Sequence, residues 1–550
     1  MQLLLKLSQY IITIYYLKFS QIFWRIYYFF RPRRFPEIKK IYETRRIKLH
    51  TRFLRKPDSL LQKNKFNFLN EIHFVSDALK IKKNNSKKLW LYNLNYFDFL
   101  NSNLNKSKKL LALDFIERWI FHLKSPHYIG YDPYPTSLRI VNWIKFYLHS
   151  NMMNKKIKVS LYNQTEFLYH NLEWHLLGNH ILANAKALIF SGLFFTGPDA
   201  KKWKVKGIKI YESQLKEQIL DDGGHFEKSP MYHAIILEDI LDIINIHGES
   251  ENYLPPAFIN QLVVTAEKML LWLSIMSYTN GENPHFNDST INISNSIKKI
   301  TKYAKNIGIK IPSPLKLNKK INIQTLKSSG FIRVDQKHAR TFLDIGSIGA
   351  SYIPGHAHAD TMCFETSFFG DRFFVNLGIS TYEYSTRRLL ERSTSSHNTV
   401  EINNKNSSCV WSSFRVAQRA SVFNLKIKNI SKSNFEVSCS HNGYNSILKK
   451  NYHFRKWIFE PQKIIIIDQT TIPNTPAIAN FNLYPGIEIF KKNNNNFLLR
   501  KNNKTVNFLV KQGQVKIVNK LYAVEFGNLL KTKCISIILQ KEKSEVILSW

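Results

Sequence analysis

The chain has 550 residues, and its 79 Lys and Arg against 40 Asp and Glu give a formal net charge of +39. Hydrophobic residues make up 44% and aromatic residues 13%, whereas Gly (20) and Pro (18) are few, which excludes a disordered, collagen-like or low-complexity chain. The four cysteines lack CxxC spacing, which argues against a disulfide scaffold or a cysteine zinc finger.

The excess of positive charge indicates an acidic partner, and composition leaves three classes open: nucleic acid, an anionic membrane and a polyanionic glycan. A competing interpretation is that most of the charge has no ligand, because 59 of the basic residues are lysines and only 20 are arginines. Planar carboxylate and phosphate groups favour the fixed fork of arginine. Single arginines are therefore more informative than the total.

Residues 1–45 form an amphipathic, basic N-terminal segment. Charged residues interrupt its apolar positions, so no uncharged run approaches the roughly 20 residues that span a bilayer. The segment also lacks the clean features of a secretory signal. We expect a helix packed on the protein's own body, with peripheral membrane contact through residues 1–34 as the alternative. The predicted location is cytoplasmic, at most peripheral at the inner membrane.

Residues 46–315 have a helical pattern. Apolar residues recur at steps of three and four within 208–219 and 236–244, and the breaker Asp221-Asp222-Gly223-Gly224 lies between these segments. Many medium helices without intervening strands indicate stacked helical hairpins, which suit a toroid or a solenoid. Further helices are predicted at 108–123, 136–149, 159–177, 180–195 and 257–278.

The pattern changes after a linker that contains Pro312, Pro314 and several lysines (Lys316, Lys319 and Lys320). From residue 326 to 550 the segments are short, β-branched and aromatic. Residues 363–369 and 372–375, separated by Gly370-Asp371, predict a hairpin. Regularly spaced strands of this kind indicate a large antiparallel β-sandwich. Other predicted strands are 463–467, 497–500 and 535–539.

The densest cluster of candidate chemical groups is Gly355-His-Ala-His-Ala-Asp360. In an extended chain His356 and His358 lie on the same face, because side chains alternate with a period of two. They are candidates for two metal ligands, or for one ligand and one acid or base. His397, in a polar segment that begins at Arg392, is a candidate to complete a site with His358.

The helical half contains two further clusters of candidate functional residues. Gly178-Asn179-His180 interrupts a long apolar pattern, although Asn179 also suits a helix cap. The loop 222–233 carries many titratable groups into the next helix, where Tyr232 is either functional or a packing aromatic. We find no phosphate-binding loop, no dinucleotide fingerprint and no nucleic-acid-binding motif, so nucleic acid is not the expected partner.

Taken in this order, the motifs resemble those of the heparinase II/III-like polysaccharide lyases, which include alginate-lyase-like enzymes. The resemblance implies an N-terminal incomplete (α/α) toroid followed by a C-terminal antiparallel β-sandwich. The matching segments are 90–98, 134–143, 178–180, 222–232 and 284–288 in the helical half, and 355–360 and 392–399 in the β half.

The resemblance also implies β-elimination on a uronate-containing glycan. The carboxylate beside the weakly acidic C5 proton must be neutralised, a base must remove that proton, and an acid must protonate the departing O4. By analogy, Asn179 and His180 neutralise the carboxylate, and Tyr232 is the acid and, depending on the epimer, also the base. His356 is the partner acid or base, or stabilises the charge. Glu227 and Arg392 are expected to support substrate binding or ring orientation, and Arg139 to support substrate binding.

The chemistry requires no cofactor, but zinc-bearing members of the family imply a structural zinc site. Two of its ligands match His358 and His397, whereas the third, an Asp in those members, is Asn376 here. A neutral amide is a poorer zinc ligand than a carboxylate, so the metal is either absent or held with Asp360 as the substitute.

We therefore predict a polysaccharide lyase that acts on an acidic glycan, with a hypothetical role in capsule or O-antigen metabolism. The competing hypothesis is a non-catalytic protein that keeps the fold and binds or assembles acidic glycans. A membrane-surface protein that uses residues 1–34 is the third class. The identity of the glycan, the epimer cleaved and the oligomeric state stay open.

Overall fold

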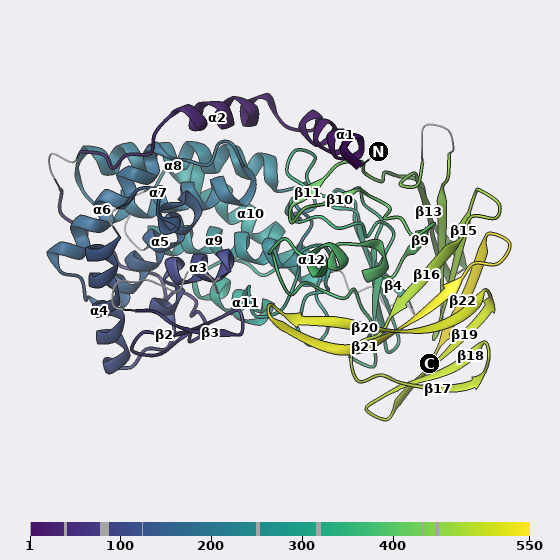
Figure 1. Ribbon diagram of the computed structural model, residues 1–550. Helices are drawn as coiled ribbons and strands as arrows, with labels where there is room; N and C mark the ends of the chain where they lie inside the picture. Colours follow the sequence, from purple (N-terminus) through teal and green to yellow (C-terminus); the bar gives the residue numbers. More distant parts are fainter. Residues whose placement is uncertain are drawn as a thin grey trace.

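The computed structural model describes residues 2–37, 41–76, 87–123, 125–248, 254–314, 321–431, 434–445 and 450–550, with side chains from Lys6 onward. It consists of a helical half followed by a β half (Figure 1). This confirms the predicted order of a helical toroid and an antiparallel sandwich. Residues 311–314 of the predicted linker belong to no helix or strand, and its Lys316, Lys319 and Lys320 lie outside the described residues.

The helical half alternates inner and outer helices. The inner helices are buried on nearly every side and contact one another in chain order, as expected for helices that are apolar all round. The inner helices are α5 (Pro133–Ser150), α7 (Gly178–Phe194) and α9 (Pro230–His247), each followed by an outer helix: α6 (Lys155–His170), α8 (Gly197–Gln218) and α10 (Pro256–Ile275). Helices α3 (Lys88–Tyr96), α4 (Lys106–His122) and α11 (Ile297–Asn306) complete this half.

Two predictions in this half are wrong. The helix expected over 159–177 ends at His170, because the following residues turn: Leu177 has a φ of 65°, and the Glu173 carbonyl accepts bonds from the amides of Leu176 and Leu177. A small antiparallel sheet also lies where no strand was expected. Phe66 and Phe68 point inward from its middle strand. The strands are β1 (Leu60–Gln62), β2 (Lys65–Phe68) and β3 (Glu71–Phe74).

Three antiparallel sheets share one core in the β half. The five-stranded sheet has the order β4 (Ile321–Leu326), β5 (Phe331–Gln336), β6 (Ala339–Asp344), β7 (Phe364–Phe368), β8 (Asp371–Phe374). The eight-stranded sheet has the order β12 (Val422–Ser431), β13 (Asn434–His441), β14 (His453–Glu460), β15 (Lys463–Thr470), β22 (Lys543–Ser549), β19 (Lys504–Gln512), β18 (Asn496–Lys501), β17 (Glu488–Asn493). The four-stranded sheet has the order β20 (Gln514–Glu525), β21 (Asn528–Ile538), β16 (Ala477–Asn482), β9 (Val400–Ile402).

The strand predictions agree with this arrangement. The predicted hairpin is β7–β8, where Phe368 pairs with Asp371, and the other predicted segments lie in β15, β18 and β21. Buried and outward residues alternate along β14 and β22, which is the pattern of a sheet with one face on the core.

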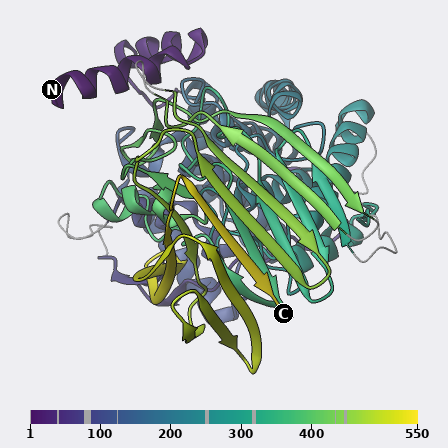
Figure 2. The same cartoon turned by 90° about the vertical axis from the view of Figure 1, so that its right-hand side faces the viewer.

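Short elements link the two halves. A small hairpin of β10 (Val410–Trp411) and β11 (Arg415–Val416) and the helix α12 (Thr386–Glu391) lie at the junction. Two N-terminal helices, α1 (Gln2–Tyr15) and α2 (Phe19–Phe30), run along the outside of the molecule (Figures 1 and 2). Helix α2 crosses the helical half, and α1 lies against β11.

Candidate active site

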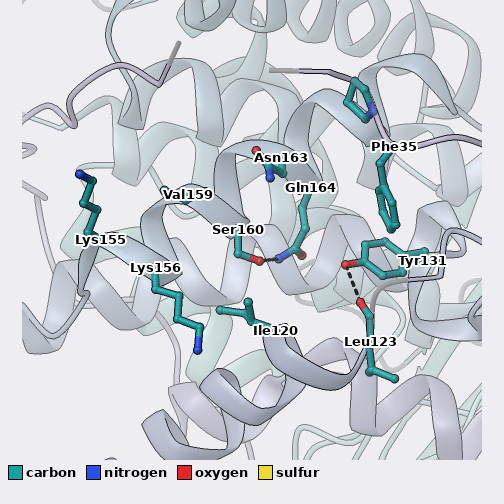
Figure 3. A pocket seen from close by; sticks show the side chains of 11 residues that line it. Phe35, Ile120, Leu123, Tyr131, Lys155, Lys156, Val159, Ser160, Asn163 and Gln164 are labelled. Atoms are coloured by element: carbon teal, nitrogen blue, oxygen red, sulfur yellow. Dashed lines mark hydrogen bonds between the residues drawn. The ribbon is translucent and has the colours of Figure 1, made fainter. Parts of the chain in front are cut away.

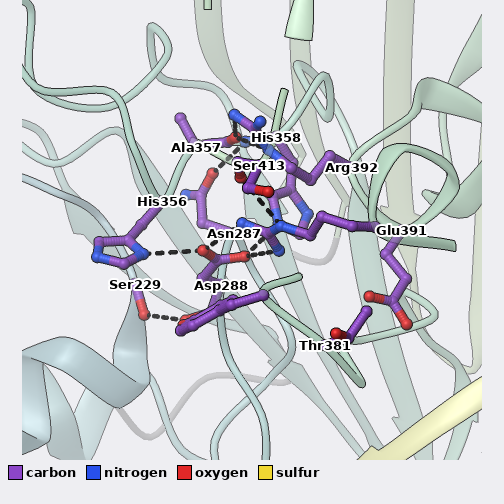
Figure 4. Close-up of polar contacts among 12 residues, drawn as sticks. Ser229, Asn287, Asp288, His356, Ala357, His358, Thr381, Glu391, Arg392 and Ser413 are labelled. Atoms are coloured by element: carbon purple, nitrogen blue, oxygen red, sulfur yellow. Dashed lines mark hydrogen bonds and ion pairs between the residues drawn. The ribbon is translucent and has the colours of Figure 1, made fainter. Parts of the chain in front are cut away.

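Asp288 lies at the centre of the candidate site (Figure 4). Its side chain is fully buried and accepts four bonds: two from the Arg388 guanidinium at 2.5 and 2.7 Å, one from His356 Nδ1 at 2.8 Å and one from His358 Nε2 at 2.8 Å. Burial alone would raise the pKa of Asp288, but Arg388 and the two histidines hold it well below its usual value. Asp288 is therefore a permanent carboxylate that orients both imidazoles.

His356 and Tyr232 form a stacked pair, with ring centroids 3.9 Å apart and planes at 30°. Tyr232 stands in the first turn of α9, where the Ser229 hydroxyl caps its amide at 3.2 Å. The Tyr232 hydroxyl lies 3.1 Å from the Tyr382 hydroxyl. Burial, followed by Tyr382, raises the pKa of Tyr232 well above its usual value, so Tyr232 holds its proton at neutral pH.

Glu227 connects this pair to the start of α7. Its carboxylate is buried, and among the residues that the structure describes neither oxygen has a hydrogen-bond partner. His356 Nε2 lies 3.9 Å from Oε2. Burial raises the pKa of Glu227, while His356 and His180 oppose the rise. A Cβ at Gly178, where φ is +58°, would lie 2.9 Å from Glu227 Oε1, so glycine is required there.

Asn179 and His180 occupy the first turn of α7. His180 Nδ1 lies 2.9 Å from the Glu173 carboxylate, whose other oxygen accepts a bond from Asn184 at 3.0 Å. The Tyr134 ring lies 4.6 Å from the imidazole. Burial opposes the charge on His180, but Glu173 outweighs it, so the pKa of His180 is raised. The structure thus brings Asn179, His180, Glu227, Tyr232 and His356 into one neighbourhood.

The predicted zinc ligands are only partly assembled. His358 Nδ1 lies 3.0 Å from His397 Nε2, and the Nε2–H group of His358 donates a hydrogen bond to Asp288. The side-chain nitrogen of Asn376 lies 3.7 Å from Cys363 Sγ, and its side-chain oxygen accepts a hydrogen bond from the backbone N–H of Asn398 at 3.4 Å. Asp360 instead lies with Asp344 and Cys363, the one three-residue group of possible ligands found among the described residues.

These residues fit a zinc ion poorly. Two imidazoles and an amide supply no carboxylate or thiolate, and a single N–H···N bond already explains the contact between His358 and His397. Zinc binding stays a prediction, and we assign no chemical step to it.

Two of the predicted substrate-binding residues are placed elsewhere. Arg139 is fully buried in α5, where it bonds to Gln164 and to the carbonyls of Asn95 and Gly130 and stacks on a tryptophan ring. Arg392 is also fully buried, and its donors face the carbonyls of Ala357 and of the β10–β11 hairpin. Both guanidiniums are occupied within the protein, so they position backbone and do not face a ligand.

Arg388 and Tyr382 are site residues that the sequence did not single out, and Asp288 was quoted only as part of the 284–288 motif. Asp288 is far from both His356 and Arg388 in the sequence, so no local pattern shows that these three side chains meet. The available signal was a second arginine four residues before Arg392, one helical turn earlier and within α12.

A cavity of about 610 Å³ adjoins the stacked pair. Tyr232 and Tyr382 line it, together with Lys145, Lys186 and Asp239 of the inner helices. A second cavity of about 750 Å³ lies between α4 and α6 and is lined by Phe35, Tyr131 and Lys156, among others (Figure 3). None of the candidate catalytic residues lines it. Tyr232, one of the four candidate catalytic residues, lines the 610 Å³ cavity, so we regard this cavity as the candidate substrate cleft.

Comparison with known proteins agrees with this geometry. Residues 140–308 match the family model described as heparinase II/III N-terminus, and residues 319–550 match heparinase II/III-like, C-terminal. A heparin-sulfate lyase of Bacteroides stercoris is 29% identical over 271 residues, 44% of this chain and 39% of that protein. A heparin-sulfate lyase of Pedobacter heparinus is 26% identical over 251 residues, 42% of this chain and 36% of that protein. The matched segment thus spans less than half the length of either relative.

Solved structures share the fold. A crystal structure of heparinase III superposes with a TM-score of 0.68 at 16% identity, over 86% of this chain and 80% of that one. A second heparinase III structure gives a TM-score of 0.61 at 18% identity, over 95% of this chain and 87% of that one.

Replacing Asp288 should destabilise the fold. Asp288→Asn leaves the buried Arg388 cation without its counter-charge, which we expect to cost about 3–5 kcal/mol of unfolding free energy in urea titrations. Asp221→Asn, at an exposed position before α9, is the matched control and should change stability little. Equal midpoints for both variants would contradict the central role of Asp288.

The pair of His180 and Glu173 should make stability depend on pH. A raised pKa means that the pair stabilises the fold fully below the unfolded value of 6.5, and that this contribution is lost as the pH rises through the folded pKa. The difference in unfolding free energy between wild type and His180→Gln should therefore shrink from mildly acidic to alkaline pH. The same comparison made in a Glu173→Gln background should be flat, and a slope there would refute the assignment.

Proposed function

The chain belongs to the heparinase II/III-like family, and from that premise we propose that it is a polysaccharide lyase that cleaves a uronate-containing glycan by β-elimination. The observation that carries the proposal is the stacked pair of Tyr232 and His356 on the Asp288 carboxylate, next to the buried group of Asn179, His180 and Glu227. This arrangement brings candidates for the base, the acid and the carboxylate clamp together beside the cavity that Tyr232 lines.

His180 and Asn179 bind the uronate carboxylate in this proposal. The raised pKa of His180 favours the imidazolium, which offsets the negative charge of the carboxylate. The Asn179 amide donates a second bond. Both interactions strengthen as the C5 carbanion delocalises into the carboxylate, so they stabilise the transition state more than the bound substrate.

His356 is the base. Because Nδ1 donates to the permanent Asp288 carboxylate, the neutral ring carries its lone pair on Nε2. Nε2 lies too far from Glu227, at 3.9 Å, for a hydrogen bond, so it is available to take the C5 proton. The orientation of the ring by a buried carboxylate follows the same logic as other carboxylate–histidine pairs.

Tyr232 is the acid. Its raised pKa keeps the hydroxyl protonated, and the Tyr382 hydroxyl at 3.1 Å orients it. In the elimination, the C5 proton moves to His356 Nε2, the C4–O4 bond breaks as the C4–C5 double bond forms, and the Tyr232 proton moves to O4. The products are an unsaturated uronate end and a free hydroxyl end.

The charges of the cleft favour a glycan with few negative groups. Three lysines line the cavity, and Lys145 and Lys186 already pair with Asp242 at 2.5 and 2.6 Å. Five acidic residues also line it, and polar amides and tyrosines fill the remaining surface. Such a lining suits sugar hydroxyls and isolated carboxylates better than dense sulfate groups. The acidic residues are Asp58, Asp98, Glu238, Asp239 and Glu525.

We further propose a surface polysaccharide of the producing cell, such as a capsule or O-antigen glycan, as the natural substrate, with cytoplasmic action as part of the same hypothesis. The relatives described above are heparin-sulfate lyases. For this chain we propose a different, less densely charged glycan. The competing hypothesis of a non-catalytic glycan-binding protein predicts binding without turnover.

Turnover tests the proposal directly. Purified protein with a uronate glycan should produce ultraviolet absorbance from unsaturated ends, and Tyr232→Phe and His356→Gln should each lower kcat by about 10²–10⁴-fold, because each removes a proton-transfer group. Tyr384→Phe, which alters a tyrosine that is 71% exposed, is the matched control and should keep full activity. Wild-type binding without any unsaturated product would support the non-catalytic hypothesis.

A substrate panel tests the charge argument separately. Unsulfated uronate glycans, including the surface polysaccharide of the producing cell, should be cleaved with a higher kcat/KM than heparin or heparan sulfate, because the cleft offers few unpaired cations for sulfate. Faster cleavage of the sulfated polymers would overturn the specificity while leaving the lyase assignment intact.

A further inference from the structure

The two N-terminal helices carry an unusual concentration of exposed apolar side chains. Twelve large hydrophobic residues between Leu7 and Phe35 are exposed, and several are almost fully so: Tyr15 and Phe19 by 82%, Phe29 by 83% and Phe30 by 76%. We call the outward side of α1 and α2 the N-terminal helical surface; it is made of these residues apart from Tyr10 and Phe35, which pack on Trp411 and Tyr131. Apolar surface of this extent needs a binding partner, because contact with water is unfavourable.

The opposite side of α1 is fixed to the β half. Trp411 packs edge-on against Tyr10 at 4.8 Å and donates a hydrogen bond to the Thr13 hydroxyl at 3.2 Å. The Arg419 guanidinium lies 3.6 Å above the Tyr16 ring. These contacts determine which side of α1 faces outward.

The opposite side of α2 is fixed to the helical half. Gln21 is buried and donates to the Leu176 carbonyl at 3.1 Å, and the Tyr28 hydroxyl donates to the Leu172 carbonyl at 2.6 Å. Trp24 stacks on Trp174 with centroids 6.2 Å apart. Both helices therefore belong to the folded body and run along its outside (Figures 1 and 2), and the apolar side chains named above are exposed there.

Charge identifies the partner. The first 36 residues contain six basic residues and no acidic residue. Lys18 and Arg33 hold the helices to Glu217 and Asp132. Lys6, Arg25 and Arg34 are exposed beside the apolar side chains. A second copy of this chain would bring two positively charged surfaces together, which repel, whereas anionic lipid headgroups complement them.

We propose that the N-terminal helical surface binds the surface of an anionic lipid bilayer. The helices have 14 and 12 residues, too short to cross a hydrocarbon core of about 30 Å, so they lie in the interface with their apolar residues inserted. Tyrosine, tryptophan and phenylalanine suit this position, and the basic residues contact the headgroups. Among the described residues one helix, α10, is long and apolar enough to cross a membrane, but half of that stretch is buried in the protein.

Vesicle sedimentation of the full chain tests the proposal. The protein should pellet with vesicles of equimolar phosphatidylglycerol and phosphatidylcholine, pellet much less with phosphatidylcholine alone, and be released by salt. The variant Phe19→Ser, Phe29→Ser, Phe30→Ser should lose binding by about an order of magnitude. The matched control is Phe490→Ser, Leu529→Ser, Leu530→Ser, which changes exposed apolar residues of the β half and should bind like wild type.

Circular dichroism and sedimentation velocity complete the test. Equal spectra for the wild type and both variants exclude misfolding as the cause of lost binding. Absence of pelleting with anionic vesicles overturns the proposal, and so does equal pelleting with both vesicle types. A wild-type dimer that the Phe19, Phe29 and Phe30 variant abolishes, without vesicle binding, would assign the surface to a second copy instead. None of these measurements depends on the lyase activity.

Discussion

Burial of the Asp288 carboxylate is the constraint on which the rest of the site depends. An unpaired charge at this depth would cost several kcal/mol, so the fold must supply partners. They come from two segments, Arg388 at α12 and the two histidines of the 355–360 loop, while Ser229, at the start of α9, donates to the backbone carbonyl of Asp288 at 2.6 Å. Asp288 therefore links the start of α9 to the β half through its backbone carbonyl, and its carboxylate sets the tautomer of the His356 imidazole.

Sequence patterns predicted those parts of the fold and site that are encoded locally. The order of helices and strands follows from periodicity, and Asn179, Tyr232 and His356 stand in short motifs whose residues are neighbours in the chain. Arg139 and Arg392 bind backbone carbonyls, and a guanidinium that does so has the same sequence signal as one that binds a substrate. The bonds of Arg392 to the Ala357 carbonyl agree with the alternative expectation of a role in ring orientation. The pair of Asp288 and Arg388 spans 100 residues, and no local pattern reveals such a contact.

The positions of the charged residues show which part of the net charge of +39 belongs to the candidate site. The cleft lining contains more carboxylates than ammonium groups, and its lysines are held in ion pairs with acidic residues of α9. Most of the excess positive charge therefore lies away from the candidate active site. The part that is concentrated in the first 36 residues accompanies exposed aromatic side chains, which distinguishes it from a uniform background of surface lysines.

The β10–β11 hairpin joins these two regions. One side of it holds α1 through Trp411, and its turn presents the Ser412 and Ser413 carbonyls to Arg392 and Arg388 at 3.1 and 3.0 Å. The seven residues of this hairpin thus contact both α1 and the two arginines at the junction. Loss of this hairpin would therefore weaken the attachment of α1 and remove carbonyl acceptors from Arg388 and Arg392 at the same time.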